Sequence, residues 1–180
     1  EIIRSGEKNI NNLVLFSDEN FRIKTFNKNY IGKNGNNILN ALNNRKDEIK
    51  NFINFDVSAN QKIIIIKLKK NLSSLEIEKL GAEFFNYIKL NSFLNLLMYE
   101  FNISDYSNVN KNFLELFLHG LKLRSYEFTK YKTNKKDKKI HISIFSKNKK
   151  FTFSKNSNLN SLVKGIELTK DLVSEPGNIL

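Results

Sequence analysis

The chain has 180 residues, 40% of them hydrophobic and 15 of them Phe, which is enough for one domain with a sizeable core. It contains no Cys, which excludes disulfides and thiolate metal sites and favours a reducing, cytoplasmic location. No apolar run approaches the length of a membrane span, and residues 1–30 show no signal-peptide pattern, so we expect no contact with a membrane.

The net charge of +12 has two interpretations. A basic surface is typical of proteins that bind nucleic acid. The excess is nearly all Lys, however, and Arg occurs only at positions 4, 22, 45 and 124, whereas phosphate-binding surfaces usually use the bidentate Arg side chain as well. Asn, Ile and Phe are also plentiful and share A/T-rich codons with Lys. Compositional drift therefore explains the charge better, and nucleic-acid binding remains the alternative.

In the first part of the chain, the apolar residues 13–16 predict a strand, and the alternating residues 21–25 predict a second one. Residues 32–37 form a loop whose two glycines match neither the P-loop nor the dinucleotide fingerprint. Residues 38–52 have helical periodicity, and residues 52–57 predict a strand. Residues 63–66 are four successive Ile, which is typical of a strand buried on both faces.

A helix over residues 73–88 opens with Ser73 and Glu76 at the spacing of a capping box. Gly81 lies inside this helix at a cost of roughly 1 kcal/mol relative to Ala, which we attribute to close packing of the helix on a sheet. A strand over residues 93–99, a helix over 111–124, a half-exposed strand over 140–144 and a partner strand over 151–153 follow. This order predicts an α/β fold with a largely parallel or mixed sheet and helices on both faces.

Few side chains suggest chemistry. His119 and His141 are the only histidines, and neither has a second ligand at metal-binding spacing, so we predict no metal site. His119 is expected in a helix at the edge of the core, and His141 is expected to face solvent. Glu76 and Glu78 suggest a solvated helix face. The chain has no Gly-x-Ser-x-Gly elbow and no paired acid and base, so we predict no catalytic residue.

The most informative stretch is the last one. Its apolar residues recur at helical spacing and predict a buried final helix: Leu159, Leu162, Val163, Ile166 and Leu172. Pro176 and Gly177 end it. Residues 170–178 read Lys-Asp-Leu-Val-Ser-Glu-Pro-Gly-Asn, and residues 120–133 read Gly-Leu-Lys-Leu-Arg-Ser-Tyr-Glu-Phe-Thr-Lys-Tyr-Lys-Thr. Together these segments resemble the leucyl (cytosol) aminopeptidases, with Ser174 and Gly177 as small departures from the usual residues.

The resemblance implies a three-layer αβα fold similar to the macro-domain. It implies that residues 1–165 are a non-catalytic N-terminal domain, and that residues 166–180 are a connecting helix and the start of the link to a catalytic domain absent from this chain. The whole protein would be a homo-hexameric exopeptidase that removes N-terminal amino acids from peptides with two divalent metals, zinc or manganese. The connection would depend on five residues, and we expect the two acidic ones to anchor it through hydrogen bonds or ion pairs: Asp171, Glu175, Pro176, Gly177 and Asn178.

Two further expectations concern ligands. Members of the family usually continue the buried strand into a Gly-Leu-Gly turn, whereas here residues 66–70 read Ile-Lys-Leu-Lys-Lys, which argues against a phosphate cradle for an ADP-ribose-like nucleotide. The aromatic residues Tyr126, Phe128 and Tyr131 could stack bases or pack under the sheet. The alternative function, a nucleic-acid-binding module, would use the basic surface beside them: Lys130, Lys132, Lys135, Lys136, Lys138 and Lys139.

Overall fold

The computed structural model describes residues 12–23, 37, 40–41, 50–59, 61–100, 103, 112–131, 139–145 and 158–176. The chain divides into two compact units. The sheet unit comprises residues 1–72, 92–111 and 140–151, and the helical unit comprises residues 73–91, 112–139 and 152–180. Most of the helix expected over residues 38–52, and the whole strand expected over 151–153, lie outside the described residues.

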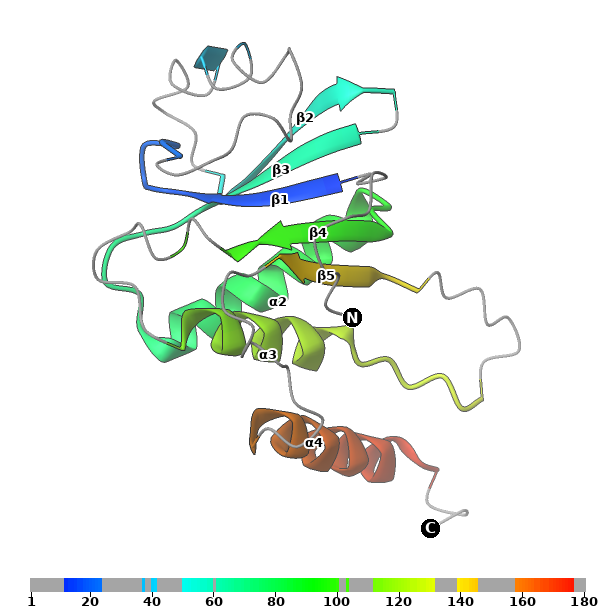
Figure 1. Cartoon of the computed structure of the whole chain (residues 1–180). Coiled ribbons are helices and arrows are strands. Elements are labelled where there is room, and N and C mark those ends of the chain that lie inside the picture. The colour runs from blue at the N-terminus through cyan, green and yellow to red at the C-terminus, as the bar shows by residue number, and fades with distance from the viewer. Residues whose placement is uncertain are drawn as a thin grey trace. The chain divides into compact units, whose positions relative to one another are not determined.

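The sheet unit contains five strands in the order β2-β3-β1-β4-β5 (Figure 1). Their bounds are Phe52–Ser58 for β2, Gln61–Lys67 for β3, Asn12–Ser17 for β1, Asn95–Tyr99 for β4 and His141–Phe145 for β5. β1 pairs in parallel with β3 and β4, and β4 pairs in parallel with β5. Only β2 runs antiparallel to its neighbour among these strands, because a short turn joins it to β3. The predicted mixed sheet is confirmed.

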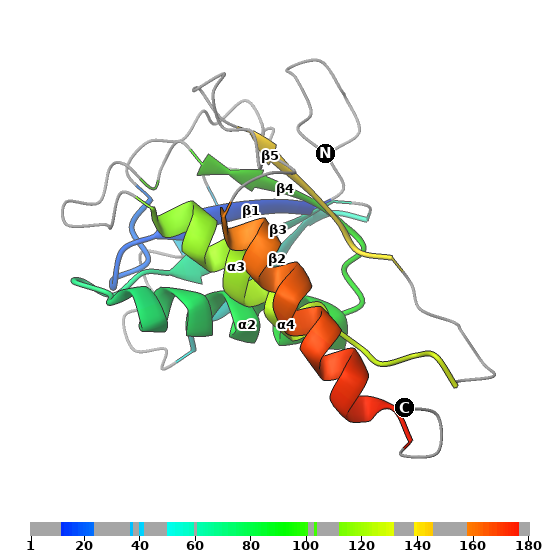
Figure 2. The same cartoon turned by 90° about the horizontal axis from the view of Figure 1, so that it is seen from below.

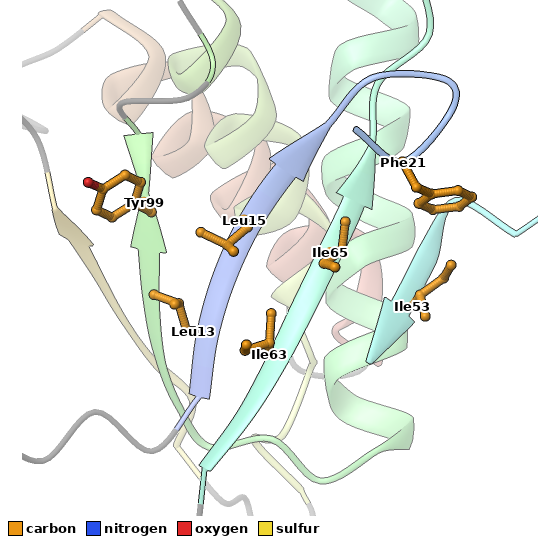
Figure 3. Close-up of a cluster of buried hydrophobic side chains, with 7 residues drawn as sticks. All are labelled: Leu13, Leu15, Phe21, Ile53, Ile63, Ile65 and Tyr99. Atoms are coloured by element: carbon orange, nitrogen blue, oxygen red, sulfur yellow. The ribbon is translucent and has the colours of Figure 1, made fainter. Parts of the chain in front are cut away.

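The centre of the sheet is buried on both faces, as the run of four Ile predicts. Ile63 is 1% exposed, and Ile64, Ile65 and Ile66 are 0% exposed. Alternate residues of a strand point to opposite faces, so burial of all four requires cover on both sides. Figure 3 shows the cluster that forms on one face, whose members are Leu13, Leu15, Phe21, Ile53, Ile63, Ile65 and Tyr99.

The strand predicted over residues 21–25 is wrong for residues 21–23, which form no strand. The carboxylate of Asp18 accepts hydrogen bonds from the backbone N–H groups of Asn20, at 2.9 Å, and Arg22, at 2.8 Å. These bonds close a turn in which Phe21 has a left-handed backbone with φ 58. The alternating pattern is therefore a turn that directs Phe21 into the cluster, where its side chain is 1% exposed.

The helical unit contains α2 (Ser74–Leu90), α3 (Phe113–Ser125) and α4 (Asn158–Ser174), with α3 beside both α2 and α4 (Figures 1 and 2). The capping box of α2 is confirmed. The Ser73 hydroxyl accepts the backbone N–H of Glu76 at 3.3 Å, and the Glu76 carboxylate accepts the backbone N–H of Ser73 at 2.8 Å. Two N–H groups that the first turn would leave unpaired are thereby satisfied.

Two glycines set the distance between α2 and α3. A Cβ added to Gly81 would lie 2.0 Å from the carbonyl oxygen of Phe117, and one added to Gly120 would lie 1.9 Å from the carbonyl oxygen of Glu78. The expectation that Gly81 serves helix–sheet packing is therefore corrected, because the group it meets is the backbone of α3. The close approach brings the rings of Phe84 and Phe117 to 5.6 Å between centroids.

The expectation of a buried final helix is also wrong. Only two residues of α4 are buried, Asn160 and Val163. No helix among the described residues is both long enough and apolar enough to cross a membrane.

Candidate functional site

The two segments that carry the resemblance meet at the C-terminal end of α4. Asp171, on the last turns of α4, accepts a hydrogen bond from the hydroxyl of Tyr126 at 2.6 Å. The neighbouring Lys170 places its ammonium 3.3 Å from the carbonyl oxygen of Leu123 and 5.1 Å from the centroid of the Tyr126 ring. Leu123 is in the last turn of α3, whose carbonyls have no partner within the helix, so the Lys170 cation complements the negative end of that helix.

Glu175 forms the second half of this contact. One carboxylate oxygen accepts a hydrogen bond from the Lys130 ammonium, and the other accepts one from the Tyr131 hydroxyl. The Glu175 side chain is 11% exposed, whereas that of Lys130 is 58% exposed. The ring of Phe128 packs edge-on against Tyr131 at 5.7 Å between centroids. We refer to Tyr126, Lys130, Tyr131, Asp171 and Glu175 as the C-terminal cluster.

The ionisation of the cluster follows from these hydrogen bonds. The bonds from Lys130 and Tyr131 lower the pKa of the Glu175 carboxyl. The bond to Glu175 raises the pKa of the Lys130 ammonium and is also the main cause of the raised pKa of the Tyr131 hydroxyl. Partial burial, followed by the hydrogen bond to Asp171, raises the pKa of the Tyr126 hydroxyl. Every shift favours the protonation state that keeps the cluster bonded at neutral pH.

These hydrogen bonds join the end of α4 to the segment that follows α3. Both acidic side chains accept hydrogen bonds, Asp171 from Tyr126 and Glu175 from Lys130 and Tyr131. Within the described part of the chain, no group of three or more His, Cys, Asp or Glu side chains could hold a metal ion. Of the other residues predicted for the connection, Pro176 is exposed just after α4, and Gly177 and Asn178 lie outside the described residues.

The predicted basic surface is only partly described. Lys130 is engaged with Glu175, and Lys139 is exposed. The other four, Lys132, Lys135, Lys136 and Lys138, lie outside the described residues. The hydroxyls of Tyr126 and Tyr131 donate hydrogen bonds to acidic side chains of the helical unit. The sequence suggested base stacking or packing under the sheet for these aromatics, and neither interpretation included these bonds.

The end of β3 offers few donors for a phosphate. The backbone N–H of Lys67 donates to the Asn51 carbonyl at 2.9 Å, and that of Leu68 donates to the Ser17 carbonyl at 2.9 Å. The backbone N–H of Lys70 donates to the carboxylate of Glu19 at 3.0 Å. A phosphate cradle needs unpaired N–H groups, so these internal bonds, like the missing glycines, argue against a phosphate cradle at the end of β3.

Sequence reasoning missed one buried polar pair in the helical unit. His119 is 3% exposed, and its Nδ1 lies 3.2 Å from a carboxylate oxygen of Glu78, which was expected to be solvated. Its Nε2 is buried and has no partner among the described residues. Because His119 and Glu78 are 41 positions apart, no sequence pattern indicated this contact. His141, in contrast, is exposed as expected.

The chain was compared with known proteins. No family model matches it. One curated relative, a "Probable cytosol aminopeptidase" of Phytoplasma australiense, is 38% identical over 66 residues, which are 36% of this chain and 13% of the relative. The sequence match confirms the resemblance to the cytosol aminopeptidases that the two motifs predict.

Solved structures show the fold. A mutant of tomato leucine aminopeptidase matches with a TM-score of 0.56 and 16% identity, over 100% of this chain and 38% of the tomato chain. The macrodomain of Thermus aquaticus DarG matches with a TM-score of 0.52 and 11% identity, over 81% of this chain and 96% of that one. The predicted macro-domain-like α/β fold is confirmed. The chain thus resembles the N-terminal domain of an aminopeptidase and spans well under half the length of the two aminopeptidases it matches.

Proposed function

We propose that this chain is the non-catalytic N-terminal domain of a leucyl-aminopeptidase-like exopeptidase that removes N-terminal amino acids from peptides. The observation that carries the proposal is the C-terminal cluster. Residues 120–133 and 170–178, the two segments that resemble the family, contact each other through Tyr126 and Asp171 and through Lys130, Tyr131 and Glu175. The resemblance therefore covers one contiguous contact as well as two stretches of sequence.

The proposed chemistry belongs to a catalytic part outside this chain. Two divalent metals, zinc or manganese, would there polarise the scissile carbonyl and activate a water. The described residues of this chain contribute no group of metal ligands, so we assign it no catalytic step. Its own contribution is structural, because the cluster fixes the direction in which the chain leaves α4 near Pro176.

The remaining parts of the proposal are assembly and location. We place the parent protein in the cytoplasm, with support from the absence of Cys and from the word "cytosol" in the name of the Phytoplasma protein. We propose a homo-hexamer as the assembly. Nucleic-acid binding is not favoured, since the sequence match is to a cytosol aminopeptidase and Lys130 is engaged within the protein.

The test begins with the intact mass of the natural polypeptide that carries this sequence. We expect a mass well above 21.0 kDa. The purified polypeptide should hydrolyse a leucyl-peptide analogue when manganese is added and should lose this activity with a chelator, whereas the 180-residue chain should show none. A natural polypeptide of 21.0 kDa, or a longer one without metal-dependent peptidase activity, would refute the proposal.

A further inference from the structure

The carboxyl edge of the sheet is where an open α/β sheet usually binds a ligand, because the loops that follow parallel strands meet there. In this chain the parallel strands β1 and β3 form part of that edge, and their register continues to the pair Ser17 and Lys67. The segments that follow the two strands stay in contact, since the backbone N–H of Leu68 donates to the carbonyl of Ser17 at 2.9 Å. We call residues 18–22 the β1 turn and residues 68–71 the β3 loop.

One backbone donor of the β3 loop already binds an anion, and this anion belongs to the chain itself. The N–H of Lys70 donates to a carboxylate oxygen of Glu19 at 3.0 Å. Glu19, Lys69 and Lys70 are all exposed, so the contact lies at the surface, in a loop that carries two cationic side chains. A backbone N–H in a turn with nearby Lys side chains is an arrangement that binds phosphate groups in other proteins.

The β1 turn holds Glu19 in this position. The Asp18 carboxylate accepts the N–H groups of Asn20 and Arg22, which closes the turn. Phe21 anchors the turn, because its side chain is 1% exposed and belongs to the apolar cluster (Figure 3). A carboxylate that the fold holds in place acts intramolecularly, at an effective concentration far above that of a free anion in solution.

We propose that Glu19 is a built-in occupant of an anion-binding position, and that its carboxylate excludes a phosphate-bearing small molecule from the β3 loop. The missing glycines and the internal carboxylate are two separate obstacles to a phosphate group. Only the carboxylate can be removed by a single substitution at the surface. Without it, the Lys70 N–H and the positive charge of the β3 loop become available to a phosphate group. The proposal does not depend on any peptidase activity.

Isothermal titration calorimetry with inorganic pyrophosphate tests this on the natural polypeptide that carries this sequence. A chelator is present so that bound metal ions contribute nothing. Wild type, Glu19→Ala and Glu115→Ala are compared, and circular dichroism checks that each protein is folded. Glu115→Ala is the matched control, because it removes one exposed carboxylate from the first turn of α3 and changes the net charge by the same amount.

We expect Glu19→Ala to bind pyrophosphate more tightly than wild type and Glu115→Ala by a factor of about ten or more, because a charge that repels the anion and competes for the Lys70 N–H is gone. Equal affinities of the two variants would overturn the proposal, since the gain would then come from net charge alone. A wild type that binds as tightly as Glu19→Ala would also overturn it. If Glu19→Ala does not fold, Glu19→Gln is compared with Glu115→Gln, and the same order with a smaller difference is expected.

Discussion

The same substitution, Gly to Ala, should have opposite effects at two positions of the helical unit. At Gly81 the new methyl group would lie 2.0 Å from the carbonyl oxygen of Phe117 and 3.1 Å from the backbone nitrogen of Leu121. The first distance is about 1.4 Å shorter than ordinary van der Waals contact. Both atoms belong to the backbone of α3 and cannot rotate away, so α2 and α3 would have to separate.

The magnitude follows from two opposing terms. Overpacking of a close contact typically costs about 1–3 kcal/mol, and a backbone obstacle belongs at or above the upper end of that range. Ala stabilises the interior of a helix by about 1 kcal/mol relative to Gly. The net loss for Gly81→Ala is therefore about 2 kcal/mol or more, which for a chain of this length lowers the melting temperature by roughly 4–8 °C.

Gly165→Ala is the matched control, because apart from the adjacent backbone of α4 itself no atom lies within 4 Å of the new methyl group. Only the propensity term remains there, so the 180-residue chain should gain about 1 kcal/mol. Its melting temperature should rise by roughly 2–4 °C. Thermal unfolding followed by circular dichroism measures both variants. A Gly81→Ala chain that melts at or above the wild-type temperature would show that α2 and α3 do not approach each other as closely as described.

Three further predictions concern the cap and the C-terminal cluster. Ser73→Ala should destabilise the chain by about 1 kcal/mol in urea unfolding, because it removes the hydroxyl that accepts the N–H of Glu76, and an unchanged midpoint would contradict this role. The pKa of Glu175 is lowered in the folded protein, so its contribution to stability is present above the unfolded pKa of about 4.3 and is lost as the pH falls through the folded pKa. The free energies of unfolding of wild type and Glu175→Gln should therefore differ near pH 6 and converge in acid. A difference that persists unchanged at about pH 2 would refute this linkage. Asp171→Ala in the full-length protein should lower stability or assembly and leave turnover per folded molecule intact, whereas equal melting with lost kcat would contradict it.

The sequence was most informative where one local rule decides the structure. The Ser73 and Glu76 capping box needs only residues three positions apart, and the four successive Ile of β3 indicate burial on both faces without knowledge of the neighbouring strands. The turn at residues 18–22 was missed because a hydrogen-bonding Asp side chain overrides an alternating pattern.

Features that depend on distant partners could not be predicted in the same way. The reason for Gly81 is the backbone of Phe117, and the partner of Glu78 is His119, each more than 30 residues away. The burial of α4 was predicted wrongly for a related reason. Apolar periodicity locates a stripe on a helix, but it does not tell which body covers that stripe. For the C-terminal cluster, the motifs pointed to Asp171 and Glu175 as anchors, whereas the tyrosines that bond to them were open to other interpretations.

The position of β1 has a consequence for synthesis on the ribosome. β1 is the first described strand to be made, yet it lies in the middle of the sheet between β3 and β4, with Leu13 paired to Ile63 on one side and Leu97 on the other. About 50 more residues must therefore be translated before one edge of β1 can pair, and more than 80 before the second can. At a translation rate of about 5–20 residues per second, this apolar strand waits for several seconds with its backbone unpaired, and during that time the nascent chain is exposed to aggregation.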